Sequence, residues 1–185
     1  MRYFCTAALA LIWIWVGPAE AAWTQPQPQM LQPAAGVGLG ILELRGLKAA
    51  WGLSGGEDVV RLPQGLVELS PPAPTGSGWG VRLSGGFGLL EGEKLLTFEL
   101  SLLLGLPLRG ARAYLGGGSG ILSYRGQFYP TLHLMSGLKG EALGPLPLTI
   151  FMDVKLISVL DLSGSPPLLG APLQLTPGVM LYLRF

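Results

Sequence analysis

His133 is the only histidine of the chain and the only side chain with an ordinary pKa close to neutral pH. A serine-hydrolase arrangement would join it to a serine and a carboxylate, for which the candidates are Ser136 and Glu141. On a single β-strand, however, positions 133 and 136 project to opposite faces, so the serine Oγ does not reach the imidazole. We therefore expect His133 to be a structural residue and the protein not to be an enzyme.

Metal and phosphate chemistry have equally little support. Cys5, the only cysteine, lies in an N-terminal apolar run, and a single histidine leaves few ligands for a transition metal. The glycine-rich stretches 36–40 and 116–118 lack the lysine and the helix of a phosphate-binding loop. A formal charge of +1 gives no argument for nucleic acid. We expect no metal, no cofactor and no nucleic-acid partner.

The N-terminus has the pattern of an export signal. Arg2 precedes a thirteen-residue apolar run, 4–16, and Pro18-Ala19-Glu20-Ala21 provides small residues for cleavage. The run is too short to span a bilayer. We expect a signal peptide at 1–22, a Pro/Gln-rich disordered leader at 23–35 and one domain at 36–185.

The composition is unusual for a soluble domain. Only 12% of the residues are charged, and the mean hydropathy is +0.48. Beyond the N-terminal run, no stretch of eighteen or more apolar residues is present. A hydrophobic chain without a hydrophobic helix is typical of a membrane β-barrel.

Apolar residues recur at every second position through most of the domain, which predicts β-strands with one apolar face. The clearest case places Leu96, Phe98, Leu100, Leu102 and Leu104 opposite Thr97, Glu99 and Ser101. The expected strands are 37–53, 57–69, 79–90, 94–108, 110–124, 127–139, 146–160 and 173–185. An even number of strands, eight, fits an antiparallel up-and-down transmembrane barrel.

Three of these segments are less regular. The alternation changes parity near Leu42 and again at Pro63-Gln64-Gly65, which predicts a bulge in the first strand. Gly116-Gly117-Gly118 interrupts the fifth segment, as at a bend in a barrel. Short turns are expected at Ser54-Gly55-Gly56, Glu91-Gly92-Glu93 and Arg125-Gly126, and a long connection at 161–172.

The alternation leaves open which face points inward. A soluble lipocalin-like barrel would enclose its leucines around a ligand, whereas a membrane barrel presents them to lipid. The second reading is favoured because charged residues gather on the face without leucine. The expected lumen residues are Arg82, Glu99, Arg112, His133, Asp153, Lys155 and Arg184.

The last segment carries the most specific motif. Val179, Leu181 and Leu183 alternate with Met180, Tyr182 and Arg184 up to the final Phe185. This pattern resembles the C-terminal strand of small bacterial outer-membrane β-barrels of the OmpA/OmpX type.

The resemblance implies an outer-membrane location and a role in envelope integrity or a minor surface interaction. It also implies that Phe185, Leu183, Leu181 and Val179 form a signal read by the barrel-assembly machinery, after delivery by periplasmic chaperones. The alternatives are a soluble periplasmic lipid-binding barrel and, third, a lipid A-modifying enzyme.

Overall fold

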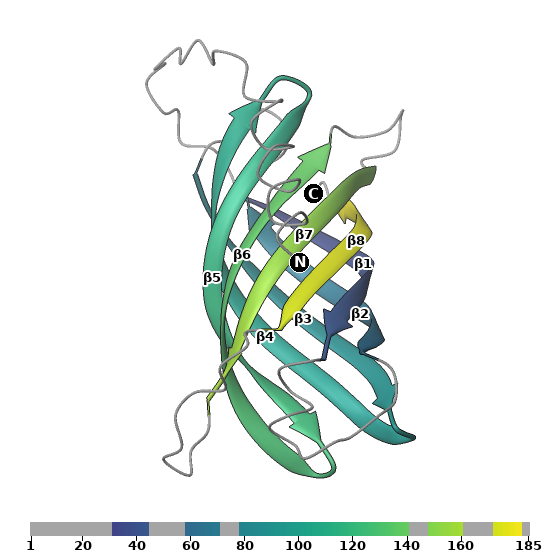
Figure 1. The fold of residues 1–185 in the computed structure, drawn as a ribbon. Coiled ribbons are helices and arrows are strands. Elements are labelled where there is room, and N and C mark those ends of the chain that lie inside the picture. Colours follow the sequence, from purple (N-terminus) through teal and green to yellow (C-terminus); the bar gives the residue numbers. More distant parts are fainter. Residues whose placement is uncertain (1–30, 45–57, 71–77, 141–147, 161–171, 183–185) are drawn as a thin grey trace, which may run out of the picture.

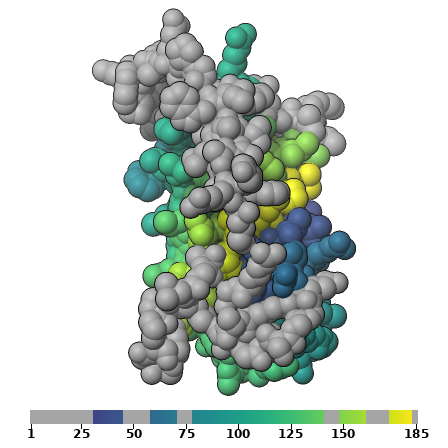
Figure 2. All heavy atoms as spheres, viewed as in Figure 1, coloured from purple at the N-terminus to yellow at the C-terminus, as the bar shows by residue number. Residues whose placement is uncertain are grey.

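The computed structural model describes residues 31–44, 58–70, 78–140, 148–160 and 172–182, which form a closed barrel of antiparallel strands (Figure 1). The strands are β1 (Gln32–Glu43), β2 (Val59–Ser70), β3 (Gly78–Leu90), β4 (Glu93–Leu108), β5 (Ala111–Tyr124), β6 (Gln127–Gly140), β7 (Leu148–Val159) and β8 (Leu173–Tyr182). Each pairs with the next, and β8 pairs with β1 to close the wall. These two strands lie side by side in Figure 2. The expected eight-stranded up-and-down barrel is confirmed.

Two-residue turns join four of the strands at one end of the barrel. Glu91-Gly92 connects β3 to β4 and Arg125-Gly126 connects β5 to β6, with φ of 53° and 80° in the first turn and 51° and 75° in the second. Positive φ at both central residues is the type I′ geometry, whose twist matches that of the paired strands. Among the described residues, no helix is long and apolar enough to cross a bilayer. We call this end, where β3–β6 make these turns, the hairpin end.

The bulge expected in the first strand is wrong. β1 pairs with β2 residue for residue from Gln32↔Ser70 to Glu43↔Val59. The inward face of both strands changes its chemistry along the strand while the backbone keeps its parity. On β2 the inward residues begin with Val60 and Leu62 at the hairpin end and continue as Gln64, Leu66 and Glu68.

The first strand also has other limits than expected. It begins at Gln32, so residues 32–35 belong to the barrel and not to a disordered leader. It ends at Glu43, and β2 begins at Val59. The turn expected at Ser54-Gly55-Gly56 lies outside the described residues. The remainder of the leader and the signal peptide lie outside the described residues.

The glycines of β5 do not interrupt it. Register is continuous with β4 from Leu95↔Tyr124 to Leu108↔Ala111. At Gly118 the neighbouring chain lies so close that an added Cβ would stand 1.9 Å from the carbonyl oxygen of Leu100. Glycine therefore permits a close strand approach here.

The two faces of the wall differ sharply. Outward positions of β4, such as Leu100 and Leu102, are about half exposed, with Leu102 at 57%. The inward positions between them, Glu99 and Ser101, are 3% and 0% exposed. The apolar face thus lies outside and the charged face inside.

Candidate functional site

The candidate site is the interior of the barrel, where the described part of the chain buries seven charged side chains. They are Glu68, Arg82, Glu99, Arg112, Lys139, Asp153 and Lys155. Four are basic and three are acidic, so the acids and bases nearly balance. Charges withdrawn from water require partners, because the desolvation cost of an isolated ion amounts to several kcal/mol.

Arg82 is the centre of the larger group. Its Nε donates a hydrogen bond to Glu68 Oε2 at 2.9 Å, and its other nitrogens donate to Asp153 and to the Tyr114 hydroxyl. Its guanidinium also lies over the rings of Tyr114 and Phe151, at 5.1 Å and 5.4 Å from their centroids. One arginine on β3 therefore ties together β2, β5 and β7 across the lumen.

Lys139 completes this group from β6. It donates to Glu68 Oε1, so the two oxygens of this carboxylate bind two different cations. Its Nζ also lies 4.9 Å from the centroid of the Tyr114 ring. The carboxylate of Glu68 is thus the common anion of Arg82 and Lys139, and its removal would leave both cations short of a partner.

A second group lies beside the first. Lys155 on β7 donates to Glu99 Oε2, and the Ser84 hydroxyl donates to the same oxygen at 3.1 Å. Together the two groups connect β2, β3, β4, β6 and β7 through buried ionic contacts. Such contacts make the interior a filled polar core, as expected of a barrel whose width only accommodates side chains.

The histidine has a serine partner that the sequence does not indicate. His133 Nε2 lies 2.8 Å from Ser101 Oγ, and both side chains are buried. In the register, Gly118 stands between them, paired with Ser101 on one side and with His133 on the other. His133 Nδ1 has no hydrogen-bond partner among the described residues, so no carboxylate orients the imidazole as in a catalytic triad.

Glycine makes room for the largest inward side chains. A Cβ at position 105 would stand 1.9 Å from Arg112 Nε, and one at position 137 would stand 2.4 Å from the Tyr114 hydroxyl. Arg112 donates to the carbonyl of Gly78 at 3.2 Å. Because Gly105 and Gly137 have no side chain, they leave the volume that Arg112 and Tyr114 fill.

Apolar residues lie on both sides of the inward polar residues of β4 and β7. On β4 the inward polar residues Thr97, Glu99 and Ser101 lie between the inward Leu95 and Leu103. On β7 the inward pair Asp153 and Lys155 lies between Phe151 and Ile157. The layer at the hairpin end is a cluster formed by Leu42, Leu44, Val60, Leu62, Leu90, Leu95, Leu122, Tyr124, Ile157 and Val159. Packed apolar side chains at this end oppose a continuous water path through the lumen.

Of the lumen residues that the sequence singles out, Arg184 lies outside the described residues. The structure places the others on the inward face; they are Arg82, Glu99, Arg112, His133, Asp153 and Lys155. Glu68, Lys139 and Ser101 are absent from the lumen residues that the sequence singles out. Glu68 could have been found by continuing the period of two unchanged through Pro63.

His133 and Ser136, which the spacing predicts to lie on opposite faces, are indeed kept apart. His133 points inward and is 4% exposed, whereas the neighbours of Ser136, Leu115 and Val154, are outward residues of β5 and β7. Ser136 therefore lies on the opposite face of the wall, as expected from the spacing. Glu141 lies outside the described residues. Of the terminal-strand residues, Val179 and Leu181 point outward, and Leu183 and Phe185 lie outside the described part of the chain.

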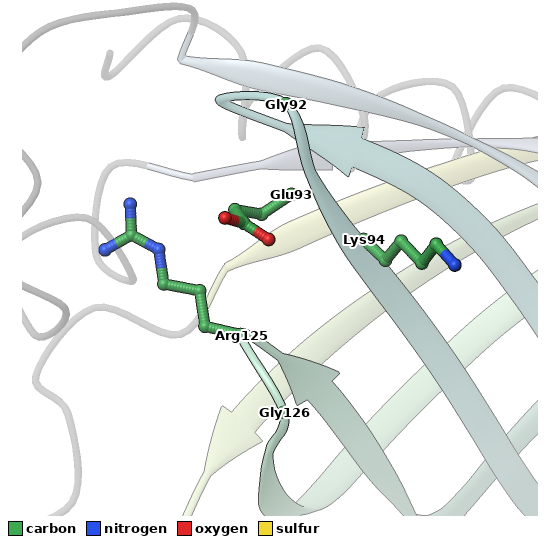
Figure 3. A pocket seen from close by; sticks show the side chains of 5 residues that line it. All are labelled: Gly92, Glu93, Lys94, Arg125 and Gly126. Carbon is green, nitrogen blue, oxygen red and sulfur yellow. The ribbon is translucent and has the colours of Figure 1, made fainter.

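One hollow lies on the surface, between two turns of the hairpin end. It has a volume of about 460 Å³ and is lined by Gly92, Glu93, Lys94, Arg125 and Gly126 (Figure 3). Arg125 forms an exposed ion pair with Glu91 at 3.6 Å. The hollow contains neither a histidine nor a hydroxyl side chain, so nucleophilic catalysis has no residue there.

Comparison with known proteins supports the fold. The sequence matches no protein-family profile and no curated protein sequence. The structure is similar to that of Neisserial surface protein A, with a TM-score of 0.50 and 10% sequence identity over 83% of this chain and 97% of that one. It also aligns with Ail, the attachment invasion locus protein of Yersinia pestis, with a TM-score of 0.42 and 14% identity over 82% of this chain and 96% of that one.

Proposed function

We propose that this protein spans the outer membrane as a closed barrel and serves envelope integrity or a surface interaction, without enzymatic activity. The observation that carries the proposal is the inversion of its two faces. Seven charged side chains of the described residues are buried in the interior, whereas the outward face exposes leucines, valines and phenylalanines along the strands. Water does not favour such a surface, whereas the hydrocarbon of a bilayer does.

The height of the apolar face supports the same reading. On β4 the outward residues from Leu96 to Leu106 are all apolar and exposed. Ten residue steps at about 3.3 Å, tilted by about 40°, rise roughly 25 Å along the barrel axis, which is the height of the apolar band of outer-membrane barrels.

The interior argues against the soluble alternative. A lipid-binding barrel of the lipocalin kind needs an apolar cavity for its ligand. In this barrel Glu68 and Asp153 are buried in the lumen, and both accept hydrogen bonds from the buried Arg82. These side chains occupy the volume that an acyl chain would need.

Fractionation tests the proposal. We expect the protein in the outer-membrane fraction, with a folded band that migrates differently from the boiled one on a gel. Recovery in the soluble periplasmic fraction would contradict it. Reconstituted in a planar bilayer, the barrel should produce no steady conductance, because side chains fill its lumen.

We further propose that Phe185, Leu183, Leu181 and Val179 act as the assembly signal, and that residues 1–22 direct export. Val179 and Leu181 contribute to the outward face of β8, with exposures of 38% and 40%. Replacing Phe185 by serine should lower the amount inserted in cells while the purified chain still refolds in detergent. Equal insertion of the variant in cells would contradict the signal.

A further inference from the structure

Two cations lie in one row across the strands of the outward face. Arg61 on β2 and Lys94 on β4 are both exposed. Lys94 pairs with the outward Leu89 of β3. Continuing the β2–β3 register brings Arg61 to the other side of Leu89, and a Cβ on Gly88 would stand 3.0 Å from the Arg61 carbonyl oxygen. Arg61 and Lys94 therefore flank one strand, two strand spacings or about 9.6 Å apart.

Lys94 lies at the edge of the apolar band on β4, and Arg61 lies in the same row across the strands. From Lys94 toward the middle of β4, the next outward residues are Leu96 and Phe98. From Leu89 toward the middle of β3, the next outward residue is Phe87. In the opposite direction, at the hairpin end, lie the turns with Glu91 and Arg125. Long basic side chains at such a boundary extend their charged ends toward the lipid headgroups while their stems rest on apolar surface.

Neither cation is neutralised by the part of the chain that the structure describes. The ion pairs there join Arg82, Lys139 and Lys155 to inward carboxylates and Arg125 to Glu91, and none of them includes Arg61 or Lys94. Figure 3 shows the side chain of Lys94 pointing to the other side of β4 from that of Glu93. On the neighbouring strand β1, Glu43 pairs with Val59, and Ile41 pairs with Arg61, so Glu43 lies two residues farther along β1 than the position opposite Arg61.

We propose that Arg61 and Lys94 bind the phosphate of an anionic membrane lipid, and this inference rests on the membrane location proposed above. The guanidinium and the ammonium group would donate hydrogen bonds to the phosphate oxygens from either side. The acyl chains of the same lipid would lie on Leu89, which is exposed between the cations, and on Phe87 and Leu96, which are exposed toward the middle of the barrel. The outward face thus combines both halves of an amphipathic ligand in the correct order.

The test uses the full barrel in nanodiscs of phosphatidylcholine and phosphatidylglycerol in equal amounts. Native mass spectrometry of the released barrel reports the lipids that stay bound. We expect phosphatidylglycerol to exceed phosphatidylcholine in the wild type by roughly five-fold or more, since each cation at an anionic lipid surface contributes about that factor. The double variant R61Q/K94Q should retain the two lipids equally.

The matched control is R109Q/R125Q, which removes two exposed cations from turns and changes the net charge by the same amount. It should keep the preference, and Glu43→Gln should increase it. Equal loss of the preference in both double variants, or no preference in the wild type, would overturn the inference. Failure of the wild type to insert even into pure phosphatidylcholine would instead contradict the membrane location itself.

Discussion

Ser101 Oγ and His133 Nε2 lie 2.8 Å apart although β5 runs between their strands. They meet because Gly118, their common neighbour, has no side chain. The pair resembles the beginning of a hydrolase site, yet Ser101 is 0% exposed and no described carboxylate binds the other ring nitrogen. The bond is better understood as a structural hydrogen bond that joins β4 to β6 on the inward face of the barrel.

Replacing Gly118 by alanine should destabilise the barrel. The new methyl group would stand 1.9 Å from the Leu100 carbonyl, and backbone atoms yield little. Overpacking of this kind costs about 1–3 kcal/mol, measured as a shift of the urea midpoint for the barrel refolded in lipid. Gly85→Ala is the control, because its nearest neighbour would be 3.6 Å away. A Gly118 variant as stable as the control would mean that β4 and β5 do not approach this closely.

Removing the charge of Glu68 should cost far more than removing that of a surface acid. Glu68→Gln leaves Lys139 without its carboxylate and Arg82 with only Asp153. Removing one partner from a buried ionic group lowers the free energy of unfolding by about 3–5 kcal/mol. Glu91→Gln, which breaks the exposed pair with Arg125, should cost less than about 1 kcal/mol. Urea unfolding of both variants in the same lipid checks the difference, and equal losses would contradict the central role of Glu68.

How far the sequence could predict this barrel depends on the chemistry of the inward face. On β4 and β7 the inward residues are polar through the middle of the strand, so the alternation alone assigns Glu99 and Asp153 to the lumen. On β1 and β2 the inward residues change from Leu42 and Val60 in the apolar layer to Gln64 and Glu68. Hydropathy then changes parity while the backbone does not, which explains the incorrect bulge.

The partners of the buried charges could not be predicted either. Glu68 and Lys139 are 71 residues apart, as are Arg82 and Asp153. Their contacts depend on how the strands stagger around a closed barrel and on the reach of side chains across its lumen. Alternation assigns a residue to a face, but it does not determine its height relative to strands on the far side.

Alanine at Ser101 or His133 should change stability and leave lipid chemistry unchanged. Losing one buried hydrogen bond costs about 1 kcal/mol, and the unpaired partner can raise the cost further. The urea midpoint measures this loss. Mass spectra of lipid A from cells with the wild type, with either variant and without the protein should be identical. A lipid A species that requires both side chains would show that the pair is catalytic and would revive the enzymatic alternative.

The most direct prediction concerns the surface that meets lipid. Leu100 and Leu106 lie on the same outward face of β4, one near the middle of the strand and one near its end. Arginine at Leu100 should destabilise the barrel in a bilayer by about 2–4 kcal/mol, and arginine at Leu106 by about 0–1 kcal/mol, because the cost of a cation falls away from the bilayer centre. If the face met water instead, both substitutions would cost little and would not differ.

A nitroxide at the same two positions separates these outcomes without adding a charge. In a bilayer, the label at Leu100 should be accessible to oxygen, which concentrates in hydrocarbon, and protected from a water-soluble nickel reagent. The label at Leu106, closer to the interface, should show a smaller ratio of oxygen to nickel accessibility. Such a difference in the accessibility ratio between the two positions requires an outward face surrounded by lipid. High nickel accessibility at both positions would place Leu100 in water and would contradict a transmembrane barrel.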